Sequence, residues 1–159
     1  MVSRYRGPLS VYRIADNRFP IFDGAGAERL GGRWNSVGHR VVYASLSYAG
    51  AVIEKLAQTG TGTIPKRQVW IEISIPAAVE IEEVSVADVP GWEDPDQQAS
   101  RAYGDSWIAA QRTAVLVVPS LVGRPHERNA VINQRHADFA EITATAPQPV
   151  LWDERLFRS

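Results

Sequence analysis

Cysteine is absent from this 159-residue chain, so disulfide bonds, thiol nucleophiles and thiolate metal ligands are all excluded. A reducing compartment agrees with that composition. No apolar run approaches the roughly 18 residues that a membrane-spanning helix needs. The N-terminal stretch MVSRYRGPLS also lacks the apolar core of a signal peptide. We therefore expect a cytoplasmic protein that has no membrane partner.

An excess of charge of one sign is missing as well. The chain has 17 lysines and arginines against 18 aspartates and glutamates, which gives a net charge of −1. This balance provides no electrostatic reason to expect direct binding to nucleic acid. His39, His126 and His136 do not lie at metal-ligand spacing, and no H-E-x-x-H motif occurs. We therefore predict no catalytic metal.

The composition that is present, 45% hydrophobic and 22% charged, is that of an ordinary globular protein, and the length suits one domain. Alternating or continuous apolar patterns predict several strands. They cover residues 9–14, 40–44, 68–76, 79–84 and 114–119, with two short strands around a turn within 129–147. Because strands outnumber helices and do not alternate regularly with them, we expect an α+β domain with a mixed, mostly antiparallel sheet.

The clearest helix is predicted for residues 45–60, SLSYAGAVIEKLAQTG. Ser45 or Ser47 can cap its start, and Gly60 can end it in the left-handed conformation. A second, less regular helix is predicted over residues 94–111, with an aspartate cap followed by a first-turn proline. The helix predicted for residues 45–60 has an apolar stripe at helical spacing, formed by Ala49, Val52, Ile53, Leu56 and Ala57.

The stretch GAGAERLGGRWNSVGHRVVYAS, residues 24–45, places dense glycine around Arg33 and Trp34. Glycine loses much chain entropy on folding, so this density favours tight turns or close approach of a ligand to the backbone. The dinucleotide fingerprint G-x-G-x-x-G is not met, because its third glycine is missing and Gly31-Gly32 would break the helix that should begin there. A long surface loop is the alternative interpretation.

Three arginines, Arg13, Arg29 and Arg33, and one glutamate are candidates for chemistry. Arg33 lies in the glycine-rich bend, and Arg13 lies on the first strand, where alternation directs it away from the side of Val11 and Ile14 and toward a cleft. Either guanidinium can bind a phosphate or a carboxylate. Glu54 lies at the flank of the apolar helix face, where it can reach a cleft between helix and sheet. A solvated surface side chain is the alternative at each position.

Tyr43 and Ser120 each lie at the end of an apolar strand. The position of Tyr43 is common in protein cores, and it is also one from which a ring can stack on a ligand. Ser120 follows a buried strand at its C-terminal end, where ligands often bind in α/β sheets. No G-x-S-x-G motif occurs, so a nucleophile elbow is not expected.

Taken in order, several segments resemble the RES domain, a family named for an arginine, a glutamate and a serine. The segments are VYRI, GAGAERLGGRWNSVGHRVVYAS, AVIEKL, GDSWIAAQRTAVLVVPS and NAVINQRHADF. The resemblance covers residues 9–157 of a single domain over 1–159. It implies a toxin of a bacterial toxin–antitoxin system, inhibited by an Xre-type antitoxin. It also implies a fold like that of ADP-ribosyltransferases and cleavage of NAD⁺ at the nicotinamide–ribose bond.

The same resemblance implies a set of functional residues. The positions that match the family's motifs are Arg13, Arg33, Tyr43, Glu54, Ser120 and Asn133, with Gly32 beside Arg33 in the bend. The arginines would bind the pyrophosphate, Tyr43 would stack on the nicotinamide, and ionised Glu54 would stabilise positive charge on the ribose. Ser120 would orient the substrate by hydrogen bonding. The family often has a proline after the asparagine, whereas this chain has Gln134.

Three functions stay open at the level of the sequence. The first is an NAD⁺ glycohydrolase or phosphorylase, and the second is a mono-ADP-ribosyltransferase that modifies a host protein at the same site. The third is a module that binds a nucleotide or a partner without chemistry. No residue selects water, phosphate or a protein side chain as the acceptor of ADP-ribose.

Overall fold

Nine strands form one sheet in the computed structural model, which describes residues 1–157. The strands are β1 (Ser3–Arg6), β2 (Leu9–Asp16), β3 (Val41–Ser45), β4 (Gln68–Ile75), β5 (Glu80–Glu83), β6 (Val115–Pro119), β7 (Arg128–Asn133), β8 (Thr143–Ala144) and β9 (Gln148–Pro149). The order is β1-β5-β6-β7-β3-β2-β4-β8, and β9 pairs with β4. The pair β5–β6 is parallel and the other described pairs are antiparallel, so the predicted α+β domain with a mixed, mostly antiparallel sheet is confirmed.

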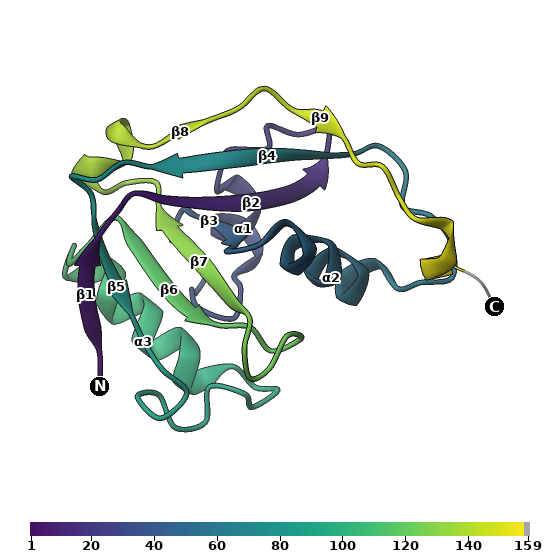
Figure 1. Cartoon of the computed structure of the whole chain (residues 1–159). Helices are drawn as coiled ribbons and strands as arrows, with labels where there is room; N and C mark the ends of the chain where they lie inside the picture. The colour runs from purple at the N-terminus through teal and green to yellow at the C-terminus, as the bar shows by residue number, and fades with distance from the viewer. Residues whose placement is uncertain (158–159) are drawn as a thin grey trace.

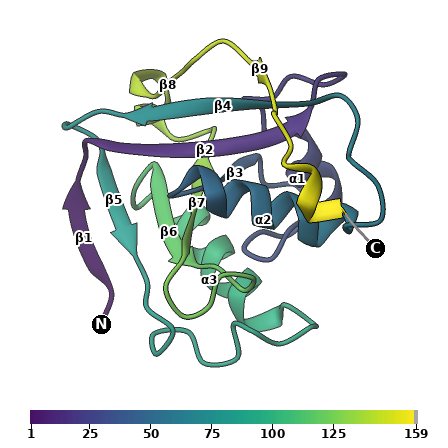
Figure 2. The same cartoon turned by 45° about the vertical axis from the view of Figure 1, so that its right-hand side comes forward.

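The helices are α1 (Ala25–Leu30), α2 (Tyr48–Thr59) and α3 (Gln98–Ala109), with short 3-10 turns η1 (Ala137–Glu141) and η2 (Glu154–Phe157). Figures 1 and 2 show α2 below β2 and β4, and α3 beside the lower part of the sheet. Residues of α3 share one apolar cluster with residues of β6 and β7. None of the described helices is both long and apolar enough to cross a lipid bilayer.

The core lies on both faces of the central strands because their sequences are apolar on both faces. The residues of β6 from Val115 to Val118 are buried, which agrees with the predicted continuous apolar strand. Ile71, Ile73 and Ile75 of β4 fill the core on one face, as strict alternation predicts. The tryptophans of the other face, together with α3, form a second cluster that contains Trp34, Trp92 and Trp107.

The sheet divides into two parts between β2 and β3. These strands pair through Tyr12 and Ser45 alone, whereas β2 pairs with β4 along its whole length and β3 pairs with β7 along its whole length. Figure 1 shows β2 and β4 running across the top of the molecule, while β1, β5, β6 and β7 run steeply below them. Beyond that one pair, β2 and β3 are not paired with each other, so a gap opens between the two strands.

The glycine-rich segment is not a surface loop, because α1 begins inside it and its centre is buried. Trp34 is 2% exposed and Asn35 is fully buried. Gly104 of α3 makes this burial possible, since a Cβ there would lie 1.7 Å from the Trp34 carbonyl oxygen. Only glycine lets α3 approach the segment so closely.

The helix α2 has the predicted Ser47 cap, but its end has a different conformation from the one predicted and it buries a different face. Ser47 caps it by accepting a hydrogen bond from Gly50 N, and Gly60 follows it with a φ of +78° and a ψ of 177°, which is not the left-handed helical conformation. The exposed residues Ala49, Ile53 and Ala57 belong to the predicted apolar stripe, so that prediction is wrong for three of its five residues. The buried residues are Gly50 and Ala51.

Two further boundaries differ from expectation. The helix predicted over 94–111 begins at Gln98, since residues 91–97 form turns whose carbonyls at 92 and 94 accept hydrogen bonds from the Arg33 side chain. The segment 129–147 forms β7, η1 and the two-residue strand β8 in place of two short strands around one turn.

Candidate active site

A cleft of about 470 Å³ opens where β2 and β3 part, with α1 and α2 on its sides. Its volume lies within the range of pockets that hold small molecules. Residues of β2, β3, α1, α2 and the ends of β6 and β7 all contribute to the lining. Of the residues predicted for the site, the cleft brings together Arg13, Gly32, Arg33, Tyr43 and Glu54.

Two neutral hydrogen-bond donors hold the carboxylate of Glu54 in the cleft. Ser120 Oγ donates to Glu54 Oε1 at 2.8 Å, and Asn129 Nδ2 donates to the same oxygen at 2.9 Å. Each donor is itself fixed, since Ser120 Oγ accepts from Gly123 N and Asn129 Oδ1 accepts from Ser45 Oγ. The second oxygen, Oε2, has no hydrogen-bond partner among the described residues and is not sealed from solvent. It is therefore available to a ligand.

Ser120 does not itself line the cleft. It is 3% exposed, and its hydroxyl lies behind Glu54. Asn129, by contrast, lines the cleft and was missed in the sequence, although it stands opposite Ser45 in the β3–β7 register. The signal for Asn129 is an amide that lies beside the hydroxyl of Ser45 on the neighbouring strand. This signal can be recognised only once the pairing of β3 with β7 is known.

Asn133 lies at the other end of β7 from Asn129 and is not among the residues that line the cleft. It is 2% exposed, and its Oδ1 accepts a hydrogen bond from Arg135 N. Its Nδ2 is buried with no partner among the described residues. No contact of Asn133 in the structure supports the expected role in holding a dinucleotide.

Arg13 reaches across the gap between the two parts of the sheet. Its Nε donates to Ile21 O at 2.8 Å and its Nη1 donates to Tyr43 O at 2.9 Å. Burial lowers the pKa of this guanidinium, and the charge of Asp23 opposes that effect. The third nitrogen, Nη2, has no partner among the described residues and is not sealed from solvent.

The predicted direction of Arg13 needs one correction. Val11 and Ile14 do not share a side, because Val11 packs in the main core and Ile14 packs against α2. Residues two apart on a strand point to the same face, so Arg13 lies on the face of Val11. The structure nevertheless places Arg13 in a cleft, as the sequence predicts.

Arg33 is anchored at the opposite wall of the cleft. Its Nη1 donates to the carbonyls of Trp92 and Asp94, at 3.0 and 3.2 Å. The neighbouring Trp34 ring stacks on Trp92, with centroids 6.4 Å apart, and makes no cation–π contact with Arg33.

Unneutralised positive charge collects at this cleft. Most arginines of residues 1–157 lie within 4.0 Å of a carboxylate oxygen. The described arginines without such a partner are Arg13, Arg29, Arg33 and Arg101. Arg13 and Arg33 line the cleft, and Arg101 donates to the carbonyl of Gly32 in its wall. The guanidinium groups are held by neutral carbonyls, which leaves their charge available to an anionic ligand.

Tyr43 presents its ring to the cleft and keeps its hydroxyl occupied. The hydroxyl donates to Asn35 Oδ1 at 2.6 Å and accepts from Trp34 N at 3.0 Å. Burial raises the pKa of Tyr43 well above its ordinary value, so the phenol stays neutral. Gly32 packs directly on this hydroxyl, since a Cβ at Gly32 would lie 2.6 Å from it. Tyr43 therefore offers a fixed aromatic surface and no proton.

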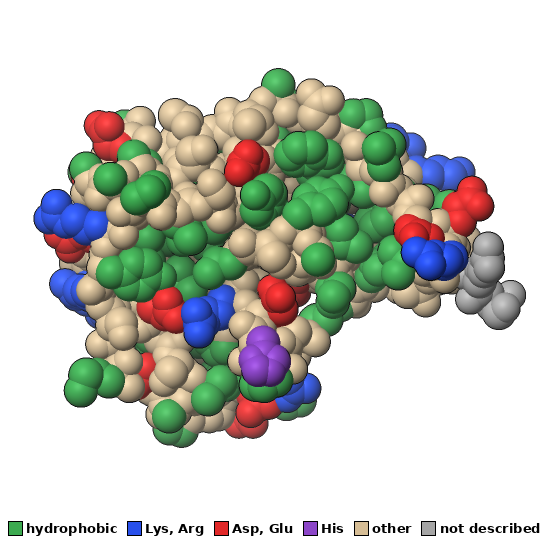
Figure 3. All heavy atoms as spheres, viewed as in Figure 1, with side chains coloured by type: hydrophobic (Ala, Val, Ile, Leu, Met, Phe, Trp, Pro, Cys, Tyr) green, Lys and Arg blue, Asp and Glu red, His purple; other side chains and the backbone are tan. Residues whose placement is uncertain are grey.

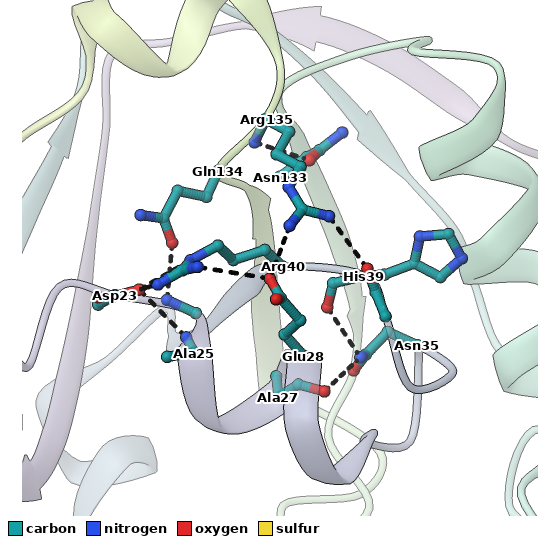
Figure 4. A network of polar contacts seen from close by, with 12 residues as sticks. Asp23, Ala25, Ala27, Glu28, Asn35, His39, Arg40, Asn133, Gln134 and Arg135 are labelled. Carbon is teal, nitrogen blue, oxygen red and sulfur yellow. Dashed lines mark hydrogen bonds and ion pairs between the residues drawn. The ribbon is translucent and has the colours of Figure 1, made fainter.

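Ion pairs hold α1 in place as a wall of the cleft (Figure 4). Arg40 binds Asp23 at 2.8 Å and lies 3.5 Å from Glu28 of α1, and Arg135 binds Glu28 at 2.9 Å. Gln134 accepts a hydrogen bond from Gly24 N at 2.7 Å, just before α1 begins. The residue that departs from the family's usual proline thus connects the end of β7 to the glycine-rich segment.

A second hollow lies beside the cleft and shares Tyr12 with it. It is lined by Tyr12, Tyr48, Trp70, Gln148, Pro149 and Leu151. Figure 3 shows hydrophobic side chains gathered on the upper right of this face, where Figure 1 places β9 and α2. Within residues 1–157, no group of three or more His, Asp or Glu side chains is arranged to hold a metal ion.

Comparison with known proteins places the chain among toxins. The family model described as "RES domain" matches residues 10–153. The protein named "Prs ADP-ribosylating toxin" of Sphingobium sp. (strain YBL2) is 38% identical over 139 residues, which is 85% of this chain and 86% of that protein. The protein named "Toxin Res" of Pseudomonas putida is 30% identical over 153 residues, covering 94% of this chain and 100% of that protein.

A second protein named "Toxin Res", from Yersinia enterocolitica, is 29% identical over 159 residues, with 93% of this chain and 99% of that protein covered. Among solved structures, a chain in the crystal structure of the M. tuberculosis MbcT–MbcA toxin–antitoxin complex matches with a TM-score of 0.72 at 16% identity. That match covers 91% of this chain and 85% of the other. At this identity the match shows a shared fold.

Proposed function

Because the chain belongs to the RES domain family, we propose that it is the toxin of a toxin–antitoxin pair and acts by cleaving NAD⁺ between nicotinamide and ribose. The names of its relatives support the first part of this proposal. The second part is carried by one observation. A carboxylate fixed by Ser120 and Asn129 stands in the same cleft as Arg13 and Arg33, which have no anionic partner in the described chain.

The two arginines bind the pyrophosphate of the dinucleotide. Each is anchored on one side by backbone carbonyls and keeps N–H groups for a ligand. Planar guanidinium groups suit phosphate oxygens, and a hydrogen bond to a charged group contributes about 1.5–3 kcal/mol. The nicotinamide ring then lies against Tyr43, whose orientation is set by its bonds to Asn35 and Trp34.

Glu54 acts at the ribose. When the bond between C1 of the ribose and the nicotinamide nitrogen breaks, its electron pair leaves with the nicotinamide, which becomes neutral. Positive charge then develops on the ribose, as it does in glycoside cleavage. The Oε2 atom of Glu54 accepts a hydrogen bond from a ribose hydroxyl and stabilises that charge, because it is prepositioned in the cleft.

Ser120 and Asn129 are positioning residues in this mechanism. Both donate to Oε1 and so keep Oε2 directed to the substrate. Ser120, buried behind the carboxylate, therefore acts through Glu54 and does not orient the ribose directly. Holding the carboxylate in one rotamer in advance lowers the cost of reaching the transition state.

ADP-ribosyl transfer to a protein is the second candidate, and it uses the same cleft. The relative named "Prs ADP-ribosylating toxin", 38% identical to this chain, favours it. Both candidates share the cleavage step and differ in whether water, phosphate or a protein side chain attacks the ribose. An antitoxin, of Xre type as the family resemblance implies, would block the cleft in a cytoplasm that contains NAD⁺.

The test follows products from NAD⁺ labelled in its adenosine half. Purified protein is incubated with the labelled NAD⁺ in three conditions: in water, in phosphate buffer and with a bacterial lysate. Free ADP-ribose identifies a hydrolase, its phosphorylated form a phosphorylase, and a labelled protein band a transferase. NAD⁺ binding by calorimetry without nicotinamide release in any of the three would overturn the proposal and leave a binding module.

Two variants make this test specific. Glu54→Gln keeps the size and the hydrogen bonds of the side chain and removes its charge, so we expect kcat to fall by about 10²–10³-fold. Glu141→Gln is the matched control, because Glu141 is exposed on η1 and its side chain makes no hydrogen bond or ion pair within residues 1–157. A wild-type rate in Glu54→Gln would remove Glu54 from the mechanism.

A further inference from the structure

Lys55 follows Glu54 on α2, lines the same cleft and is not used by the mechanism above. The sequence contains one other lysine, Lys66, which is exposed beyond the end of α2. Lys55 forms no ion pair with the described residues, and its Nζ makes one long hydrogen bond, 3.4 Å, to Gln58 Oε1. Its amine is therefore directed along the helix toward another residue of the cleft lining.

Arg13 is near enough to Lys55 to affect it. Burial lowers the pKa of the Lys55 amine, the charge of Arg13 lowers it further, and the charge of Asp16 opposes both effects. Two cations that repel each other in a partly buried site destabilise the empty protein. Because both side chains line the cleft, this pair marks a candidate site for a group that compensates its charge.

The carboxylates around the cleft do not supply that compensation. Asp16 binds Arg18 through both of its oxygens, and Asp23 binds Arg40. Glu54 is directed to Ser120 and Asn129. None of these carboxylates forms an ion pair with Arg13 or Lys55, so Arg13 Nη2 and Lys55 Nζ keep N–H groups for a further partner.

We infer that Lys55 and Arg13 together form an anion subsite on the β2 side of the cleft, which takes a phosphate group of a nucleotide. Arg33 binds from the opposite wall, so the cleft distinguishes phosphorylated ligands from plain nucleosides. This inference rests on the proposed function for the identity of the nucleotide. Lys55 is then a residue that determines substrate specificity and takes no part in bond cleavage.

Calorimetry with product-like ligands tests the subsite without any turnover. ADP-ribose, adenosine and inorganic phosphate are titrated into the wild type, Lys55→Gln, Lys55→Arg and Lys66→Gln. We expect Lys55→Gln to weaken ADP-ribose binding by about tenfold, the value of one hydrogen bond to a charged group. Adenosine binding stays unchanged, Lys55→Arg restores part of the affinity, and Lys66→Gln behaves as the wild type.

The remaining arms identify the source of the phosphate. One outcome is that inorganic phosphate binds the wild type and binds Lys55→Gln more weakly, while both proteins bind ADP-ribose equally well. In that case the subsite takes a free acceptor anion, and its assignment to the nucleotide is wrong. Equal ADP-ribose affinity in the wild type and Lys55→Gln, with no such phosphate effect, would overturn the subsite altogether. A parallel loss of adenosine binding would do the same, since it indicates a deformed cleft. Thermal unfolding of each variant confirms that it is folded.

Kinetics separate this inference from the proposed function. With NAD⁺ as substrate, Lys55→Gln should raise KM about tenfold and leave kcat close to the wild type. With nicotinamide riboside, which has no pyrophosphate, the two proteins should cleave at equal rates. If ADP-ribose binding depends on Lys55 but NAD⁺ is not cleaved, the subsite stands and the proposed reaction fails. If NAD⁺ is cleaved and Lys55→Gln has wild-type KM, the reaction stands and the subsite fails.

Discussion

Asn129 Nδ2 donates to Glu54 Oε1 over 2.9 Å and so connects the start of β7 to the middle of α2, 75 residues earlier in the chain. The bond exists because β7 pairs with β3, and β3 leads directly into α2. Ser120 reaches the same oxygen from the end of β6. Three separate segments therefore fix one carboxylate at the edge of the cleft.

The first prediction concerns these two donors. Asn129→Ala and Ser120→Ala should each lower kcat for NAD⁺ cleavage by about 5- to 30-fold with KM nearly unchanged, because one hydrogen bond of about 1–2 kcal/mol is lost. Steady-state nicotinamide release measures both constants. The double variant should lose less than the product of the single effects, since both donors act on one oxygen. Asn17→Ala, at an exposed position, is the control, and a rise in KM without a fall in kcat would contradict the positioning role.

The second prediction separates the ring of Tyr43 from its hydroxyl. Tyr43→Phe leaves Trp34 N and Asn35 Oδ1 without a partner, so unfolding free energy should fall by about 1–3 kcal/mol while the folded protein still cleaves NAD⁺. Tyr43→Ala also removes the ring and should abolish detectable binding of NAD⁺. Urea unfolding and calorimetry measure the two effects. Loss of turnover in folded Tyr43→Phe would show that the hydroxyl takes part in the chemistry.

The third prediction concerns a buried carboxylate far from the cleft. Glu82 is 1% exposed and accepts hydrogen bonds from Arg112 Nε at 3.0 Å, from Arg112 Nη2 at 3.1 Å and from the Tyr103 hydroxyl. Glu82→Gln should lower the free energy of unfolding by about 3 kcal/mol, because the buried network loses its anion. Glu80→Gln is the control, since its pair with Arg6 is exposed and should contribute less than about 1 kcal/mol. Equal effects of the two substitutions in urea would contradict the prediction.

The fourth prediction follows from the pKa of Glu82. Burial alone would raise this pKa, but the hydrogen bonds from Arg112 and Tyr103 and the charge of Arg112 lower it below the ordinary value. A depressed carboxyl pKa stabilises the folded protein above the unfolded pKa of about 4.3, and that stability is lost as the pH falls through the folded pKa. The difference in unfolding free energy between the wild type and Glu82→Gln should therefore be constant from pH 6 to 5 and shrink below about pH 4. A difference that grows toward acid pH would be inconsistent with this sign.

Much of the fold follows from the sequence, and the reasons are local. The alternation in β4, the continuous apolar run in β6 and the Ser47 cap of α2 are properties of neighbouring residues, and the structure confirms them. The family motifs also identified Arg13, Arg33, Tyr43 and Glu54, which the structure places in one cleft. Their roles in binding and catalysis stay predictions.

The buried face of α2 shows where local reasoning fails. Its apolar spacing predicted burial of Ala49, Ile53 and Ala57, yet Ile53 is 43% exposed. The helix directs Glu54 and Lys55 into the cleft instead, because Ser120 and Asn129 bind that side. Periodicity says which residues of a helix are apolar, but the surface that the rest of the chain presents decides which side is covered.

By itself, the sequence determined the central strands, the helix α2 and the mixed sheet, because spacing and residue type act within a few residues. Its family motifs also identified five of the residues that line the cleft. The tertiary structure alone decided that β2 and β3 part after a single pair, that Asn129 supports Glu54 and that Asn133 does not line the cleft. It also decided which cations lack a carboxylate partner. Each of these depends on contacts between segments distant in the chain, and such contacts form only when strand order and register are fixed.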